Sequence, residues 1–265
     1  MRKPLLSLVA VAATLMLAAC SGGGGDSPSA DANSGASGGT LTLGTTVAPG
    51  SWNLLEAQAG AAYQQYLQPV YDSLVHLNIQ GDPTASLATE WTWDDTNTVL
   101  TLTLRTDVTF TDGAVLDAAA VKANLESTKS GAGEVAGALA GVTAIDVIDP
   151  QTVQITLAAP DPSFLPRLGM APGMIASPAS LTDGSAATAP VGSGPYVLAT
   201  EGTTEGSVYT FTRNPDYWDT ATYPYDTVVL KVLTDQTARE NAVRTGEVDA
   251  AEAAPTNADS LDAAG

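Results

Sequence analysis

The chain has 265 residues, of which 10 are lysine or arginine and 29 are aspartate or glutamate, so its formal charge at pH 7 is −19. This acidic balance excludes nucleic acid and anionic lipid as partners, because both are bound by clustered basic residues. The single cysteine, Cys20, excludes a disulfide within the chain.

The first 19 residues have the features of a bacterial export signal. Arg2 and Lys3 precede an uninterrupted run of apolar and small residues at positions 5–17. This run is shorter than the roughly 20 residues that a membrane-spanning helix needs, so we interpret residues 1–19 as a cleaved signal peptide. The sequence LAAC, which ends at Cys20, is typical of a bacterial lipobox and predicts lipid on that cysteine. The alternative is ordinary cleavage with Cys20 as a bystander.

Residues 20–39 are predicted to be the lipidated cysteine and a flexible tether. Gly, Ser, Ala and Asp make up almost all of this stretch, which cannot bury apolar surface. Lipid on Cys20 would anchor the exported chain to the outer face of the cytoplasmic membrane, at the cell surface or in the periplasm. Residues 35–39 match the G-x-S-x-G pattern of serine hydrolases, but that motif needs a strained turn from strand to helix. We therefore interpret the match as compositional.

From residue 40 onward, the hydrophobic pattern alternates between strand and helix spacing. Residues 41–46 alternate as a strand. In residues 60–74, five side chains share one helical face: Tyr63, Tyr66, Leu67, Val70 and Leu74. Pro69 lies inside this predicted helix and should kink or divide it, because proline removes a backbone donor. Residues 90–105 predict a hairpin around a turn at 94–97.

The second half of the chain has the same mixture of patterns. Asp112 and Gly113 predict a turn, and Asp117 is placed to cap a helix that runs to about Thr128. The further predicted elements are a hairpin at 142–148 and 152–157, a short helix at 163–168, strands at 208–213 and 228–233, the latter buried, and a helix at 237–245 that ends at Gly246. The predicted fold class is mixed α/β (α+β), without an internal repeat.

The sequence contains no recognisable pattern of catalytic or metal-binding residues. His76, the only histidine, lies between valine and leucine, which favours a strand position over a triad or a zinc site. Asp94, Asp95 and Asp112 could be taken for a glycosidase pair, but each lies where a turn uses aspartate for backbone hydrogen bonds. We therefore predict that the protein is not an enzyme and has no cofactor and no metal site of its own.

Four motifs, in order, resemble a known family. Residues 102–113 have the sequence LTLRTDVTFTDG, residues 190–196 PVGSGPY, residues 213–218 RNPDYW and residues 244–249 RTGEVD. Together they resemble extracellular solute-binding protein family 5, the peptide, dipeptide and nickel receptors of ABC importers. The resemblance covers about residues 40–255. Ala120 and Ser193 depart mildly from the family pattern, which has Asp and Thr there.

The resemblance implies a periplasmic-binding-protein-like type II fold, with two lobes and a ligand cleft between them. Residues 40–265 would form the first, N-terminal lobe, truncated at its C-terminus, and the second lobe would be missing. The implied function is a substrate-binding lipoprotein that captures oligopeptides or similar small solutes and delivers them to the permease of an ABC importer. A structural or adhesive surface lipoprotein and an exported hydrolase are the alternatives.

The motif residues themselves favour structural roles, with Gly113, Gly192, Gly194 and Gly246 in turns or at helix ends and Trp218 in core packing. By the resemblance, the cleft is lined instead by the loop after the first strand and by segments that face the second lobe. The positions expected there are Thr45, Thr46, Val47, Ala48, Gln58, Gln64, Met170, Ala171, Pro172 and Glu252.

Overall fold

The computed structural model of the chain describes residues 38–56, 61–182 and 184–252. The predicted signal peptide, Cys20, Gln58 and nearly all of the predicted tether lie outside the described residues. The described part contains two larger sheets, a two-stranded ribbon and five α-helices, so the predicted mixed α/β class is confirmed. Within this part, no helix combines the length and the apolar character that crossing a bilayer requires.

One sheet is antiparallel and has the strand order β4-β5-β7-β6. Its strands are β4 (Ala88–Trp93), β5 (Val99–Leu104), β6 (Val142–Asp149) and β7 (Thr152–Leu157), which confirms both predicted hairpins. In β5, Leu100, Leu102 and Leu104 are buried on one face, as the alternation with threonine predicts.

The turns of this sheet are made by the residues that the sequence indicated. The carboxylate of Asp94 accepts hydrogen bonds from the backbone N–H groups of Thr98 and Val99, both at 2.8 Å. Asn97, in the same turn, adopts a φ of 53°, a value that asparagine tolerates better than most residues. Asp94 therefore has the role of a turn residue.

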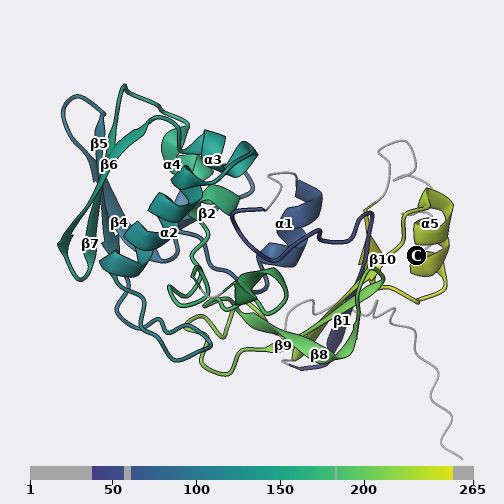
Figure 1. Cartoon of the computed structure of the whole chain (residues 1–265). Coiled ribbons are helices and arrows are strands. Elements are labelled where there is room, and N and C mark those ends of the chain that lie inside the picture. Colours follow the sequence, from purple (N-terminus) through teal and green to yellow (C-terminus); the bar gives the residue numbers. More distant parts are fainter. Residues whose placement is uncertain (1–37, 57–60, 183, 253–265) are drawn as a thin grey trace, which may run out of the picture. The chain divides into compact units, whose positions relative to one another are not determined.

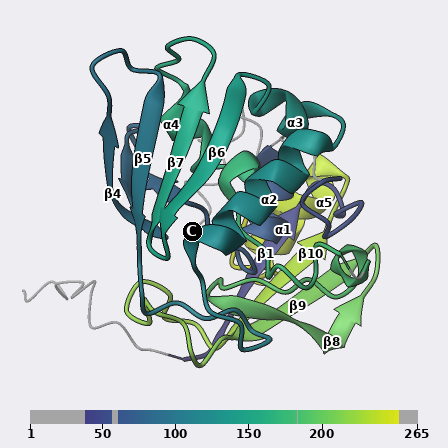
Figure 2. The ribbon, with the colours of Figure 1, turned by 60° about the vertical axis from the view of Figure 1, so that its left-hand side comes forward.

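Helix α2 (Ala118–Ser130) lies across one face of this sheet (Figures 1 and 2). Asp117 caps the helix as predicted, because its carboxylate accepts a hydrogen bond from the N–H of Ala120 at 2.7 Å. Val121 and Leu125 of this helix are buried in the same hydrophobic cluster as the leucines of β5. We call this cluster the first core.

The other sheet has five strands in the order β11-β1-β10-β9-β8. Its strands are β1 (Thr40–Thr45), β8 (Tyr196–Thr204), β9 (Val208–Arg213), β10 (Thr227–Val232) and β11 (Ala250–Ala251). β1 lies parallel to both β10 and β11, whereas β8, β9 and β10 are antiparallel neighbours. The carboxyl ends of β11, β1 and β10 therefore meet at one edge of the sheet, which we call the carboxyl edge.

The five-stranded sheet packs on an aromatic core made by Trp52, Tyr66, Tyr71, Tyr209 and Phe211. The rings of Trp52 and Tyr209 meet edge to face at 5.7 Å, and those of Tyr66 and Tyr209 at 5.3 Å. Edge-to-face contacts of this kind stabilise a core beyond the apolar area they bury. They also fix the orientation of each ring.

The helix predicted at residues 60–74 is shorter than expected. Helix α1 (Ala61–Leu67) ends two residues before Pro69, because proline lacks an N–H and disfavours helical geometry in the residue before it. Val70 and Leu74 are buried, but they lie in an irregular segment that runs from the aromatic core to the first core. The prediction was correct for the start of the helix and wrong for its end.

Shorter elements complete the described chain. They are β2 (Val75–Leu77), β3 (Pro83–Ala85), α3 (Glu134–Ala138), α4 (Phe164–Arg167), two 3-10 turns at Ala171–Gly173 and Ser185–Ala187, and α5 (Gln236–Arg244). Helix α5 ends before Gly246, which adopts a φ of 71° as the predicted stop. The strand predicted at 228–233 forms as β10, in which Val228 and Leu230 are buried and the other residues are half-buried, so the strand is less buried than expected.

Candidate functional site

The carboxyl edge brings together several of the residues that were expected to bind a ligand. Thr45 ends β1 and is paired in register with Val232, the last residue of β10. Ala251 ends β11 beside Gly44, so Glu252 follows at the same edge. In open sheets with parallel strands, ligands bind in the crevice outside the carboxyl ends.

The turn at residues 45–48 contacts Tyr66 of α1. The hydroxyl oxygen of Tyr66 lies 2.5 Å from the hydroxyl oxygen of Thr45 and 2.6 Å from the carbonyl oxygen of Val47. Tyr66 and Thr45 are fully buried, whereas Thr46, Val47 and Ala48 are half-buried. Burial raises the pKa of Tyr66 to about 12, so its phenol keeps its proton at neutral pH.

Arg239 of α5 fixes the ends of the two other strands at this edge. Its guanidinium donates hydrogen bonds to the backbone carbonyls of Leu233 at 2.6 Å, Thr234 at 3.1 Å and Glu252 at 3.0 Å. The side chain is only 8% exposed. Sequence reasoning named Glu252 but missed Arg239, because its partners are backbone carbonyls, which leave no signal in the residue types.

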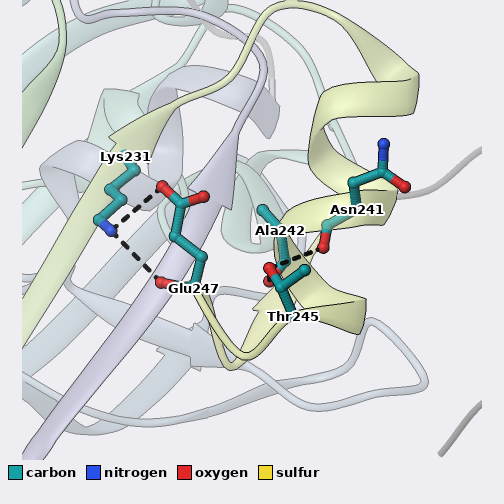
Figure 3. Close-up of polar contacts among 5 residues, drawn as sticks. All are labelled: Lys231, Asn241, Ala242, Thr245 and Glu247. Atoms are coloured by element: carbon teal, nitrogen blue, oxygen red, sulfur yellow. Dashed lines mark hydrogen bonds and ion pairs between the residues drawn. The ribbon is translucent and has the colours of Figure 1, made fainter.

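The RTGEVD motif ends α5 and attaches it to β10 (Figure 3). The hydroxyl of Thr245 donates to the carbonyl of Asn241 at 2.9 Å, and the N–H of Glu247 donates to the carbonyl of Ala242 at 2.8 Å. Lys231 of β10 reaches the carbonyl and the carboxylate of Glu247 at 3.3 and 3.5 Å. These contacts close the helix end and hold the segment that leads to β11.

The last residue of the same motif joins that segment to β1. The N–H of Asp249 donates to the carbonyl of Thr42 at 2.8 Å, and the carboxylate of Asp249 accepts from the N–H of Thr42 at 2.7 Å. This reciprocal pair satisfies both backbone groups of Thr42 just before β11 pairs with β1. The motif therefore helps to build the carboxyl edge through its hydrogen bonds to β1 and β10.

The backbone of the PVGSGPY motif packs closely against residues 69–71. The N–H of Gly194 donates to the carbonyl of Val70 at 2.9 Å. A Cβ at Gly192 would lie 2.0 Å from that carbonyl oxygen, and a Cβ at Gly194 would lie 2.6 Å from its carbon. Gly192 forms a bridge with Ala176 and is required by close approach, so its predicted turn role was wrong. Gly113, with a φ of 87°, does form a turn.

Asp72 links this motif to the RNPDYW motif. Its carboxylate is 2% exposed and accepts hydrogen bonds from the Ser193 hydroxyl at 3.2 Å, the Tyr217 hydroxyl at 3.0 Å and the Trp218 indole N–H at 3.1 Å. Burial raises the pKa of Asp72 to about 6, although these three donors and Arg105 act to lower it. Sequence reasoning missed Asp72, because its partners lie far away in the chain.

The remaining expected ligand positions differ in accessibility. Gln64 is buried in α1, where its Nε2 has no partner and its Oε1 accepts a long hydrogen bond from Gln68 at 3.5 Å. Ala171 and Pro172 are buried in a 3-10 turn, Ala171 within the aromatic core. Met170 is 36% exposed. Among the described members of the predicted set, residues 46–48, Met170 and Glu252 are therefore the accessible ones.

The polar residues weighed as catalytic candidates occupy structural positions. His76 lies in β2 as predicted, and burial lowers its pKa. The carboxylate of Asp112 accepts hydrogen bonds from the N–H of Ala114 at 3.0 Å and from the Ser177 hydroxyl at 2.5 Å, which confirms its turn role. Asp112 also lines a groove of about 480 Å³ between residues 109–113 and 214–216.

Known proteins resemble this chain in sequence and in structure. The model of the family described as bacterial extracellular solute-binding proteins, family 5 Middle, matches residues 82–265. The glutathione-binding protein GsiB of Salmonella paratyphi A is 33% identical over 165 residues, which are 61% of this chain and 32% of GsiB. This chain thus spans about a third of the length of the curated relatives that it matches.

Solved structures share the fold. The binding protein AgaA from A. tumefaciens R10, in complex with agropinic acid, has a TM-score of 0.73 and 28% identity, and the match covers 79% of this chain and 43% of AgaA. DppA from Helicobacter pylori, in complex with the peptide STSA, has a TM-score of 0.74 and 22% identity, and the match covers 86% of this chain and 49% of DppA. The match covers less than half of each neighbour, and it confirms the predicted periplasmic-binding-protein-like fold.

Proposed function

Because the chain belongs to family 5 of the bacterial extracellular solute-binding proteins, we propose that it serves as the substrate-binding component of an ABC importer. It would hold a small solute at the carboxyl edge and deliver it to a membrane permease, without making or breaking bonds. The observation that carries this proposal is the edge itself, where the turn at 45–48 and Glu252 lie at the ends of adjacent parallel strands.

We propose a peptide or a peptide-like small solute as the ligand. GsiB is named as a glutathione-binding protein, DppA was solved with the peptide STSA and AgaA with agropinic acid. The half-buried residues 46–48 and the exposed Glu252 follow adjacent strands at the same edge, and backbone groups together with a carboxylate suit a ligand that carries both hydrogen-bonding amides and positive charge. A peptide with a free amino terminus has both.

In relatives of greater length, a second lobe would supply the opposite wall and close over the ligand about a hinge. Ligand pockets bury roughly 70–90% of a ligand's surface. One wall alone leaves a large share of that surface in water and loses several kcal/mol at about 25 cal/mol per Å². Since every 1.4 kcal/mol changes affinity tenfold, we expect this chain alone to bind with a dissociation constant in roughly the millimolar range.

An NMR titration of the isotope-labelled chain tests this function. Glutathione, di- and tripeptides, a nickel chelate and an opine are added separately, and we expect one of the peptide-like ligands to shift the resonances of residues 45–48 and Glu252. The hairpin of β4 and β5 is the internal control and should not respond. Hydrolysis of a peptide during the titration would indicate an enzyme, and shifts confined to the control hairpin would contradict the proposed site.

We also propose that Cys20 carries lipid and anchors the exported chain. In support, the sequence LAAC that ends at Cys20 is typical of a bacterial lipobox. Just before β1, the N–H of Gly38 donates to the carbonyl of Pro224 at 2.7 Å. This contact lies at the end of β1 that is opposite to the carboxyl edge. β1 has six residues, and the five steps of about 3.3 Å between them place its two ends roughly 17 Å apart.

The anchoring proposal predicts the behaviour of the Cys20→Ser variant. This variant should leave the membrane fraction and appear in the soluble exported fraction, whereas the wild type stays in the membrane fraction. Mass spectrometry of the wild type should find a diacylated or triacylated cysteine as the first residue. A wild-type chain that begins at another residue, or that carries an unmodified Cys20, would show that ordinary cleavage is correct.

A further inference from the structure

The hydrogen bonds at the turn 45–48 have an assignable direction. The carbonyl oxygen of Val47 can only accept, so the hydroxyl of Tyr66 must donate its one proton to it, over 2.6 Å. The 2.5 Å contact between Tyr66 and Thr45 must then use the proton of Thr45. The result is a chain of two hydrogen bonds that runs from Thr45 through Tyr66 to Val47.

The ring that carries this hydroxyl is held on several sides. Tyr66 has no exposed surface, and its ring meets Trp52 edge to face at 6.3 Å and Tyr209 at 5.3 Å. Close packing of this kind leaves a buried ring a single orientation. The position of the Tyr66 hydroxyl is therefore set by the aromatic core and not by the turn that it contacts.

Thr45 is a poor substitute for Tyr66 as the donor to Val47. Its hydroxyl oxygen lies 3.5 Å from the Val47 carbonyl and 3.3 Å from the carbonyl of Lys231, both long for a hydroxyl hydrogen bond. Among the described residues, Tyr66 supplies the one short hydrogen bond to the Val47 carbonyl. The short hydrogen bond to the Val47 carbonyl thus comes from a side chain of α1, 19 residues further along the chain.

We propose that Tyr66 is a positioning residue that holds the turn 45–48 in one conformation before any ligand arrives. The significance of this for binding rests on the proposed function of the carboxyl edge, but the ordering of the turn does not. A preformed wall has no ordering cost to meet when the ligand binds, and such preorganisation raises affinity without adding a contact.

The Tyr66→Phe variant tests this proposal, with Tyr71→Phe as the matched control. Both tyrosines are buried in the aromatic core, but the hydroxyl of Tyr71 donates to the carbonyl of Trp52 at 3.0 Å and does not reach the turn. Backbone ¹⁵N order parameters are measured for Thr46, Val47 and Ala48 without ligand. We expect values near about 0.85 in the wild type and in Tyr71→Phe, and below about 0.6 in Tyr66→Phe.

A third variant separates the two hydrogen bonds of the chain. Thr45→Val removes the first bond and leaves the bond from Tyr66 to Val47, so the order parameters should stay close to those of the wild type. Equal loss of order in Thr45→Val and Tyr66→Phe would mean that Thr45 holds the turn. Unchanged order in Tyr66→Phe, or equal loss in Tyr71→Phe, would overturn the proposal.

One measurement on the wild type does not depend on whether the variants fold. The Tyr66 hydroxyl proton should exchange slowly with water and show an NOE to the side chain of Thr45. A hydroxyl proton in fast exchange with solvent would overturn the assignment. No ligand is present in these experiments, so they test only the ordering of the turn by Tyr66. The proposed solute binding is tested separately, by the titration with peptides.

Discussion

Replacing Gly192 with alanine is expected to lower the free energy of unfolding by about 3–5 kcal/mol, or to prevent folding. The added methyl group would lie 2.0 Å from the carbonyl oxygen of Val70 and 2.7 Å from the ring of Tyr71. Neither neighbour can give way cheaply, because the Val70 carbonyl accepts a hydrogen bond from Gly194 at 2.9 Å and Tyr71 is buried in the aromatic core. Relief of this clash would therefore move residues 190–196 away from residues 69–71, and the packing between these two segments would be lost.

Urea unfolding and calorimetry of Gly192→Ala measure this effect, with Gly137→Ala as the control. Gly137 lies in α3, where a Cβ would meet no atom within 4 Å, so alanine should be neutral or up to about 1 kcal/mol stabilising. For a domain of this size, we expect the melting temperature of Gly192→Ala to fall by about 10 °C or more. A Gly192→Ala protein as stable as Gly137→Ala would contradict the packing described for the motif.

The second large effect is a dependence of stability on pH that comes from Asp72. In the unfolded chain this carboxyl ionises near pH 3.9, whereas burial raises its pKa to about 6 in the folded protein. Between these pH values the folded state binds the additional proton. The contribution of Asp72 to stability is therefore fully present below about pH 3.9 and is lost as the pH rises through 6, by about 3 kcal/mol in total.

Asp72→Asn should remove this dependence and keep the fold. The asparagine oxygen can accept from Ser193 and Trp218, while its amide donates to the hydroxyl oxygen of Tyr217, which is able to accept. Unfolding free energies measured at several pH values between 4 and 7.5 should decrease with pH in the wild type relative to the variant. The variant is then the more stable protein at pH 7.5.

Asp94→Asn is the control for this experiment. The carboxylate of Asp94 accepts hydrogen bonds from Thr96, Thr98 and Val99, which lower its pKa to about 2. Its contribution to stability is present above about pH 3.9 and is lost only as the pH falls towards 2. Between pH 4 and 7.5, Asp94→Asn should follow the slope of the wild type. If Asp72→Asn follows that slope too, the burial of Asp72 does not govern the pH dependence.

The sequence pattern predicted those helices and strands that are determined by residues close to them in the chain. The hairpins of β4 with β5 and of β6 with β7, and the capped helix α2, follow from alternation, turn residues and Asp117. The sequence did not indicate β8 and β11. β8 has a shift in its pairing with β9 between Ala199 and Thr204, and β11 has only two residues, so each depends on a neighbouring strand more than on its own pattern.

The residues of the candidate site also differ in whether the sequence could indicate them. The turn at 45–48 and Glu252 were named from the resemblance to the family, and both follow strands at the carboxyl edge. Tyr66, Asp72 and Arg239 could not be named, because their roles come from partners that only the fold brings near: the turn after β1 for Tyr66, residues 193 and 217–218 for Asp72, and backbone carbonyls for Arg239. A buried polar residue gives little local signal when its partners lie elsewhere in the chain.

The parallel pairing of β1 constrains the order in which the chain can fold. Thr40 lies opposite Thr227, so the centre of the five-stranded sheet joins segments from opposite ends of the described chain. Strands β4 to β7 and helix α2 come from one continuous stretch and need only short loops to close. Long loops cost more entropy to close, and contacts between distant segments form slowly. The four-stranded sheet can therefore assemble while β1 is still unpaired, and we expect the carboxyl edge to be completed last.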